Sequence, residues 1–217
     1  MTQPLSFSVR ADLFRVAQAF PDAPAGVRIE PLSDGGVVMV GMTAGDLIAV
    51  VDRSGEANRA GTVSVGKALV NMAVDLFRRD GVEVRLRGEN GIAFIEPDPA
   101  GNAARNFEVA WCYPDWRALL ASYATCRLEP PLTINARITA RLSTAAIGLA
   151  RAAHSDDESV TFKGGQMAMV AEFSAWPEAV ALFGDTRRRV AIDAGHSTMW
   201  RMPAWASPHQ RLAAAGE

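Results

Sequence analysis

The sequence predicts an α+β fold built from one repeated unit, in which a strand is followed by a helix and then by antiparallel strands. Two observations support this prediction. The spacing of the apolar residues changes from every second position to helical spacing and back, in the same order, in three parts of the chain. Short runs containing Gly, Asp or Asn separate the apolar segments that follow each helix, as in a meander. We expect the helices to pack on one side of the sheets, because each carries one apolar stripe.

The first unit begins with an alternating strand at residues 5–9, which continues into a helix over 11–20. The apolar face of this helix consists of Leu13, Phe14, Val16, Ala17 and Phe20. Pro21 ends the helix, because proline has no backbone N–H to continue it. Three further strands are expected at residues 27–29, 37–40 and 47–51.

The same order of elements returns in two later segments. The second unit is expected to contain a strand at 62–65, a helix over 67–79 and strands at 82–86 and 92–95. The pair Asn90-Gly91 predicts a tight hairpin turn between the last two of these strands. The third unit is expected to contain a strand at 132–136, a helix from about 138 to 153, and strands at 160–162, 167–171, 179–183 and 190–192. A further helix over 115–123 is expected after Tyr113-Pro114.

A segment of small and polar residues, 98–104, predicts a linker between two domains. We therefore expect a first domain over 1–100, with two helix-bearing units, and a second over 107–203. Residues 204–217 show no clear period, so we expect a flexible tail.

The composition is that of an ordinary globular protein. The chain has 217 residues, 49% of them hydrophobic and 21% charged, which excludes disordered, collagen-like and disulfide-scaffold classes. Cys112 and Cys126 lack partners at zinc-site spacing and are expected to be free thiols in a reducing compartment. The opening residues do not resemble a signal peptide, and the most apolar stretch, 37–51, is too short and interrupted to span a membrane. We therefore expect a cytoplasmic protein.

The positive charge is almost entirely arginine. Among 22 basic residues only Lys67 and Lys163 are lysines, while 24 acidic residues bring the net charge to −2. Two interpretations stay open: the codon bias of a GC-rich genome, and recognition of phosphate or carboxylate groups by the planar guanidinium.

Several of these arginines lie on helical polar stripes. The stripe of the third predicted helix consists of Arg137, Arg141, Thr144, Gly148 and Arg151. Lys67, Asn71, Asp75 and Arg78 form the stripe of the second helix, and the first helix offers Arg15 and, just before its start, Arg10. Such faces suit the phosphate backbone of duplex DNA. A merely solvated amphipathic face is the alternative interpretation.

Four local features resemble the DNA polymerase sliding clamp family, which comprises the bacterial beta-subunit and phage-type processivity factors. The similarity to this family covers about residues 5–203. The four features are the turn at 41–47, the element Tyr113-Pro114-Asp115-Trp116-Arg117, the strand and helix at 63–77, and Trp200-Arg201-Met202-Pro203. Three positions depart from the family pattern: Ala44, Asp46 and Ala204.

The resemblance implies a non-enzymatic processivity factor for DNA replication: a homo-oligomeric ring of identical subunits, without a cofactor, that encircles double-stranded DNA and tethers a DNA polymerase or repair protein. The implied DNA contacts are Arg10, Arg15, Lys67, Arg78, Arg137, Arg141 and Arg151. Met202 and Pro203 are implied floor residues of a groove for partner peptides. A basic lining and an acidic outer surface reconcile the net charge with DNA association. If about twelve helix-bearing units close the ring, four units per chain make a trimer, which we favour, and three make a tetramer; a dimer or monomer stays open.

Two other function classes are compatible with parts of the sequence. The first is a clamp-fold accessory protein that binds only other proteins. The second is a small hydrolase around Ser197, but Met199 stands where a nucleophile elbow requires glycine. His154 is expected to cap a helix, residues 156–158 to form a solvated acidic loop, and Lys163 to lie outside any phosphate loop. Tyr113 and Trp116 are expected to pack in a core or interface rather than to stack on bases.

Overall fold

The computed structural model describes residues 4–20, 26–43, 46–66, 82–89, 92–96, 104–107, 115–123, 132–133, 136–165, 168–183, 191–192 and 202–207. The helices in these ranges are α1 (Ala11–Gln18), α3 (Trp116–Tyr123), α4 (Ala136–Ala152) and the short 3-10 helix η1 (Ala204–Ala206). The strands are β1 (Leu5–Arg10), β2 (Val27–Pro31), β3 (Val37–Met42), β4 (Asp46–Asp52), β5 (Glu56–Ala57), β6 (Val63–Val65), β7 (Glu83–Glu89), β8 (Ile92–Ile95), β9 (Ala104–Phe107), β10 (Leu132–Thr133), β11 (Val160–Gly165), β12 (Ala168–Phe173), β13 (Trp176–Phe183) and β14 (Ala191–Ile192).

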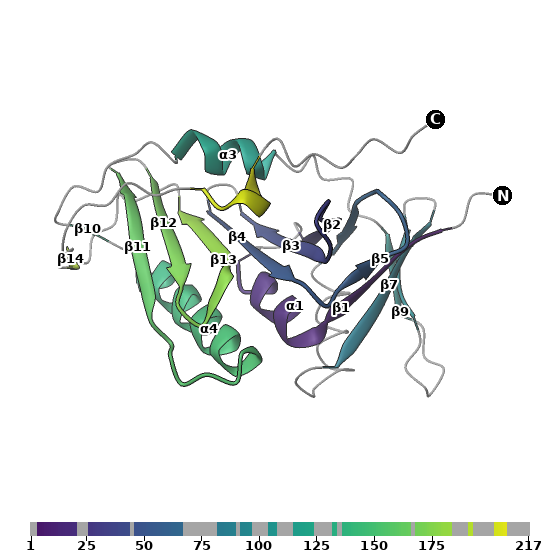
Figure 1. The fold of residues 1–217 in the computed structure, drawn as a ribbon, viewed down its shortest axis with the longest axis horizontal. Coiled ribbons are helices and arrows are strands. Elements are labelled where there is room, and N and C mark those ends of the chain that lie inside the picture. Colours follow the sequence, from purple (N-terminus) through teal and green to yellow (C-terminus); the bar gives the residue numbers. More distant parts are fainter. Residues whose placement is uncertain are drawn as a thin grey trace.

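Two antiparallel sheets dominate the fold (Figure 1). A seven-stranded sheet has the order β11-β12-β13-β4-β3-β2-β6, and a five-stranded sheet has the order β5-β1-β7-β8-β9. The two meanders of the larger sheet meet where β13 pairs with β4, in a register that runs from Ala179 opposite Val50 to Phe183 opposite Asp46. Strands from both predicted domains therefore share one sheet. The domain boundaries themselves stay a prediction.

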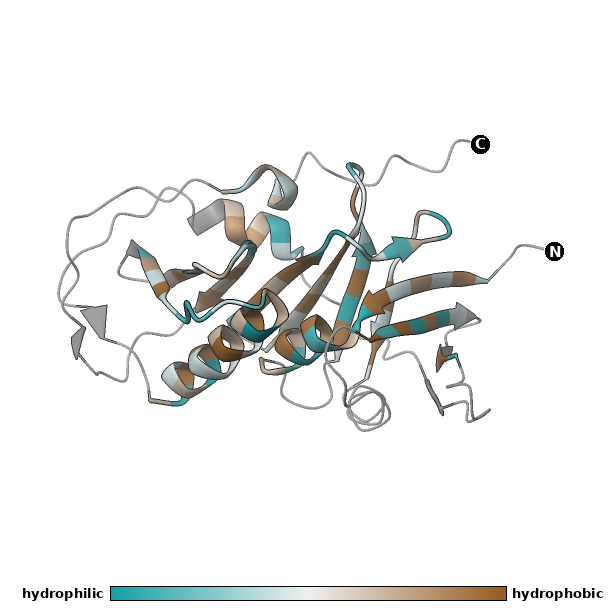
Figure 2. Ribbon diagram, turned by 60° about the horizontal axis from the view of Figure 1, so that its bottom comes forward, coloured by the Kyte–Doolittle hydropathy of each residue, from teal (hydrophilic) through white to brown (hydrophobic). Residues whose placement is uncertain are grey.

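The larger sheet is buried on both faces, because its central strands are apolar at nearly every position. All six residues of β3 are buried, and Figure 2 shows the central strands coloured as hydrophobic. Successive side chains of a strand point to opposite faces. Val37 and Met39 thus belong to a core with α1 and α4, while Val38 and Val40 belong to a second core with α3 and η1. We call these the helix face and the outer face.

The helices α1 and α4 pack side by side on the helix face (Figures 1 and 2). Gly148 permits this close approach, because a Cβ at that position would lie 2.7 Å from Val16 Cγ2. The predicted apolar stripe of this helix, Ile138, Leu142, Ala145, Leu149 and Ala153, is buried at its first four positions, and Ala153, just beyond the end of α4, is half-buried. Gly148, predicted to lie on the polar stripe, instead lies at the contact between the helices.

The α+β fold class is confirmed, and among the described helices α1 and α4 pack on the same face of the larger sheet, while α3, which belongs to none of the repeated units, covers the outer face (Figure 1). Two further predictions need correction. Strand β14 pairs with β10 in a separate two-stranded sheet and does not continue the sheet of the third unit. The expected flexible tail begins with the ordered turn η1, in which Trp205 is buried.

Most other predicted elements are confirmed to within a few residues, including the helix after Tyr113-Pro114, which is α3. Strands β5 and β9 were not predicted. The helix expected over 67–79 lies outside the described residues. No helix in the described part of the chain is both long and apolar enough to cross a membrane.

Candidate nucleic-acid interface and outer-face cluster

Two arginines are exposed on α4, one near each end of the helix. Arg137 lies in its first turn and Arg151 in its last. Arg151 follows Arg137 by fourteen positions, which places them about 21 Å apart along the helix axis. Their spacing brings them to neighbouring sides of the helix, and Ala140, Ser143 and Thr144 are exposed between them. Small side chains next to arginines leave room for a phosphate backbone to approach the helix.

Arg141, predicted to lie on the same stripe, turns toward the sheet. Its Nη1 lies 3.3 Å from Oδ2 of Asp46, and its side chain is only 13% exposed. Asp46 begins β4, where its backbone N–H bonds to the hydroxyl of Thr43 at 3.0 Å. Arg141 therefore ties α4 to the β3–β4 turn.

Arg10 joins the beginning of α1 to the end of α4. Its guanidinium donates two hydrogen bonds to Asp12, at 3.1 and 2.6 Å, and one of 2.8 Å to the carbonyl of Ala152. It also lies over the ring of Trp176, 5.4 Å from the centroid. A cation at the carbonyl end of a helix is stabilised by the helix dipole. Arg10 is thus built into the contact between the helices.

The remaining predicted DNA contacts divide into two groups. Arg15 is half-buried in the last turn of α1. Lys67 and Arg78 lie outside the described residues.

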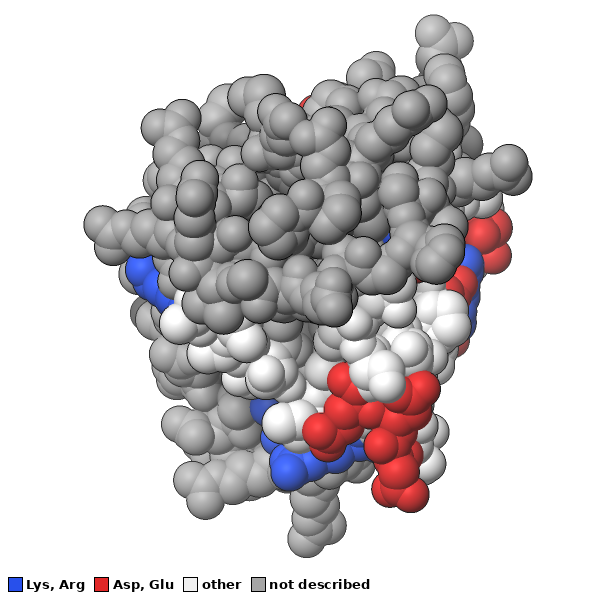
Figure 3. Space-filling view, turned by 90° about the vertical axis from the view of Figure 1, so that its left-hand side faces the viewer, with Lys and Arg blue, Asp and Glu red and all other residues white. Residues whose placement is uncertain are grey.

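The carboxyl end of α4 is followed by an exposed acidic loop. His154 adopts a left-handed backbone conformation with φ of 51°. Its N–H donates to the carbonyl of Arg151, and the N–H of Ser155 donates to the carbonyl of Ala150. Together these features form a Schellman cap. Asp156, Asp157 and Glu158 are all exposed. Hydrogen bonds from the hydroxyl and N–H of Ser159 hold the pKa of Asp157 below its ordinary value. Figure 3 shows acidic and basic side chains close together on the side of the molecule that carries β11. The end of α4 near Arg151 is therefore less positive than its beginning.

The outer face contains an aromatic cluster. Trp116 of α3 and Trp205 of η1 are 2% and 5% exposed, and their ring centroids lie 6.3 Å apart. Leu120 is buried in the same cluster, and Leu119 and Met202 pack against it. Met202 and Pro203 themselves are half-buried. The predicted core role of Trp116 is confirmed.

A buried carboxylate explains why the element at residues 115–117 is attached here. Glu30 of β2 is 4% exposed and pairs with Arg28 at 2.6 Å and with Arg117 of α3. The indole N–H of Trp116 points to the same carboxylate at 3.4 Å, and Arg117 stacks over the Trp116 ring at 4.1 Å. Asp115 caps α3 by accepting the N–H of Ala118 at 3.1 Å. Glu30 thus docks α3 onto the sheet.

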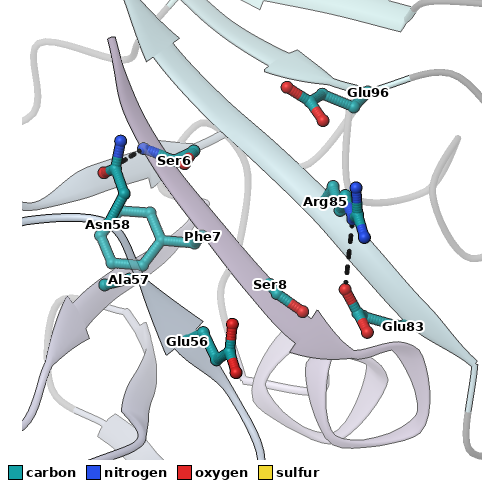
Figure 4. A pocket seen from close by; sticks show the side chains of 9 residues that line it. All are labelled: Ser6, Phe7, Ser8, Glu56, Ala57, Asn58, Glu83, Arg85 and Glu96. Atoms are coloured by element: carbon teal, nitrogen blue, oxygen red, sulfur yellow. Dashed lines mark hydrogen bonds and ion pairs between the residues drawn. The ribbon is translucent and has the colours of Figure 1, made fainter. Parts of the chain in front are cut away.

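A separate polar cavity of about 250 Å³ lies against the five-stranded sheet (Figure 4). Its acidic side chains are Glu56, Glu83 and Glu96. Glu83 pairs with Arg85 at 3.3 Å, and hydrogen bonds from Ser8 and Arg85 lower its pKa. No cluster of potential metal ligands occurs among the residues that the structure describes.

The catalytic candidates do not come together in the described residues. His154 forms the helix cap, residues 156–158 form an exposed loop, and Lys163 pairs with Glu172 at 2.7 Å. Ser197 lies outside the described residues.

Three residues that shape these surfaces were not predicted from the sequence: Glu30, Asp46 and Trp205. Glu30 and Asp46 act through partners more than eighty residues away in the chain, which no local pattern reveals. Trp205 carried a signal, since a lone tryptophan in an otherwise small and polar segment is costly to leave in water.

No known family profile and no curated protein matches the sequence. Solved structures do. The DNA polymerase sliding clamp of Caulobacter crescentus matches 89% of this chain and 67% of its own, with a TM-score of 0.59 and 12% identity. The DNA polymerase III beta chain of Streptococcus pneumoniae matches 88% of this chain and 66% of its own, with a TM-score of 0.56 and 8% identity. A sliding clamp of Bartonella birtlesii bound to griselimycin has a TM-score of 0.55 and 9% identity, and the match covers 89% of this chain and 68% of that clamp. The chain thus spans about two thirds of the length of these clamps. Its fold is the sliding-clamp fold, at a sequence distance where only the architecture is shared.

Proposed function

We propose that the protein is a sliding-clamp-like processivity factor, which encircles duplex DNA as a ring of identical subunits and tethers a DNA polymerase or repair protein. The observation that carries this proposal is the helix face. There α4, packed beside α1 on a clamp-type sheet, presents exposed Arg137 and Arg151. The proposal requires no catalysis and places the protein in the cytoplasm, in association with the nucleoid.

We assign the proposed DNA contacts by how exposed each predicted basic side chain is. Arg137 and Arg151 are exposed, and Arg15 is half-buried on the neighbouring helix, so these three are proposed to meet phosphates directly. Lys67 and Arg78, which are predicted from the sequence, complete the proposed set of DNA contacts. Arg10 and Arg141 are proposed to act mainly by positioning α4, because their guanidinium groups already pair with Asp12 and Asp46. A few exposed cations give weak, sequence-independent attraction, which permits sliding.

A subunit contact is proposed at the β11 edge of the larger sheet. In the described part of the chain, β11 pairs with β12 on one side only. A strand edge offers unpaired N–H and C=O groups to a second chain. Beside it, an apolar hollow of about 390 Å³ lies between α4 and β11, lined by Leu142, Ala146, Ile147, Val160 and Phe162 among others. A second copy docking here in head-to-tail fashion would close a ring, with the trimer favoured.

The alternative is a clamp-fold accessory protein that binds partner proteins without encircling DNA. The acidic loop beside Arg151 favours this alternative, because it repels phosphates at one end of α4.

The mass in solution distinguishes the ring-forming processivity factor from the accessory protein. Light scattering at micromolar concentration should give a multiple of the 23.2 kDa chain mass for the ring, and three times that mass for the favoured trimer. A stable monomer would reject the ring and leave the accessory protein.

A further inference from the structure

The turn η1 places one large side chain into the outer-face cluster. Trp205 is 5% exposed, Ala206 is fully buried, and Ala204 before them is exposed. The Trp205 ring lies tilted by 37° against Trp116 of α3. The cluster that surrounds it also contains apolar side chains of β3, β4 and β13, such as Val40, Val51 and Leu182. The seat of Trp205 is thus formed by α3 on one side and the sheet on the other.

The backbone hydrogen bonds that form this turn are local. The N–H of Ala206 bonds to the carbonyl of Pro203 at 3.0 Å, and the N–H of Ser207 to that of Ala204 at 3.1 Å. Neither η1 nor Met202 and Pro203 belongs to one of the sheets of the described residues. Within the described segment, the burial of Trp205, Ala206 and part of Met202 attaches the turn to the outer face. Segments with few buried contacts and local hydrogen bonds open at low free energy.

The seat itself does not depend on the turn. Trp116 is held by α3, whose attachment to β2 comes from the Glu30, Arg28 and Arg117 pairs rather than from Trp205. Departure of the turn would uncover the apolar side chains of the sheet beside the Trp116 ring. Such a site fits a short peptide that inserts an aromatic or long aliphatic side chain.

We propose that Trp205 is an intramolecular plug, which occupies the seat that a partner peptide must enter and so lowers the apparent affinity for that peptide. The assignment of the peptide to a DNA polymerase or repair protein rests on the proposed function. The competition between Trp205 and a peptide for the same seat does not. If the turn is docked in about 90 to 99% of molecules, its removal raises the apparent affinity about ten- to a hundredfold.

The test uses the full chain and a probe taken from the chain itself. A fluorescent synthetic peptide with the sequence of residues 201–208, Arg-Met-Pro-Ala-Trp-Ala-Ser-Pro, is titrated with the wild type and with Trp205→Ala, and binding is followed by anisotropy. The variant should bind at least tenfold more tightly than the wild type. The same peptide with alanine in place of its tryptophan should bind neither protein. Ala204→Ser, a change at the exposed position of the same turn, is the matched control and should behave as the wild type.

Equal affinity of the wild type and Trp205→Ala, or no binding by the variant, would overturn the plug. If Trp205→Ala fails to fold, Trp205→Phe replaces it in the titration. Its smaller ring should give a peptide affinity between that of the wild type and that of a variant lacking the plug. A peptide affinity equal to that of the wild type would again contradict the proposal. Light scattering on the same samples keeps the two proposals apart. A monomer with the tenfold gain rejects the ring but retains the plug, whereas an oligomer without the gain rejects the plug alone.

Discussion

The two faces of the seven-stranded sheet differ in how many of their arginines are exposed. On the helix face, Arg137 and Arg151 are exposed at the two ends of α4. On the outer face, Arg28 and Arg117 both pair with the buried carboxylate of Glu30. The helix face thus combines exposed arginines with Arg10 and Arg141, which pair with Asp12 and Asp46, whereas the arginines paired with Glu30 on the outer face serve to attach a helix. Net charge, which is −2 for the whole chain, reveals neither.

The difference follows from the strands. In β3 and β4 the residues at odd and even positions face different cores, so each face needs its own cover. The helix face is covered by two helices that contact each other through Gly148 and Val16. Among the residues that the structure describes, the cover of the outer face consists of the eight-residue helix α3 and the three-residue turn η1. The ion pairs of Glu30 with Arg28 and Arg117 add to the attachment of this cover.

The largest effect is expected from removing the carboxylate of the outer face. Glu30→Ala leaves the guanidinium of Arg117, which is 11% exposed, without its buried partner. Breaking a buried ion pair from one side typically costs about 3 to 5 kcal/mol. Because Arg28 is 27% exposed and can regain water, we expect a loss near the lower limit, about 3 kcal/mol, in urea unfolding.

Glu83→Ala is the matched control for Glu30→Ala. Glu83 also pairs with an arginine, Arg85, but both side chains are more than half exposed. A surface pair of this kind contributes about 0 to 1 kcal/mol. Equal destabilisation by the two variants would contradict the assigned role of Glu30 in holding α3.

A smaller effect, on DNA binding, is expected at the helix face. Charge reversal at Arg137 and Arg151 should weaken binding to duplex DNA about tenfold or more. It should also reduce the slope of log affinity against log salt, by about 0.9 for each phosphate that the protein no longer neutralises. Arg137→Glu should have the larger share, because the acidic loop at residues 156–158 already lowers the potential near Arg151. Fluorescence anisotropy with a labelled duplex at several salt concentrations measures both quantities.

Arg85→Glu controls for the change of net charge. Arg85 is exposed on β7 in the five-stranded sheet. The Arg85→Glu substitution should leave the affinity for DNA nearly unchanged. Equal loss of affinity from Arg85→Glu and from the α4 variants would show a general charge effect and contradict a DNA-binding helix face.

Much of this architecture is predictable from local patterns. The continuous apolar runs at residues 37–40 and 47–51, bounded by Gly and Asp turns, predict strands, and the spacing of Leu142, Ala145 and Leu149 predicts the buried stripe of α4. The pairing of β13 with β4 is not predictable in this way, because alternation defines which residues share a face but not which strand lies beside them.

The candidate site was harder to predict for the same reason. Helical spacing places Arg137, Arg141 and Arg151 on one polar stripe, yet it does not show that Asp46, 95 residues away, pairs with Arg141. The polar stripe of an isolated helix is only a list of residues that avoid its apolar core. A second helix can still cover part of that stripe, as α1 does at Gly148.

The smallest expected effect tests how the two helices of the helix face meet. Gly148→Ala adds a Cβ 2.7 Å from Val16 Cγ2, and the β-branched side chain of Val16 has little freedom to move away. Overpacking of this kind costs about 1 to 3 kcal/mol, while alanine regains about 1 kcal/mol of helix propensity over glycine. We expect a net loss of about 1 kcal/mol in the free energy of unfolding from these opposing terms. In a Val16→Ala background the clash is absent, so Gly148→Ala should there become neutral or stabilising. The coupling from this double-mutant cycle should therefore be about 1 kcal/mol or more, and strict additivity would contradict a contact between α1 and α4 at these two residues.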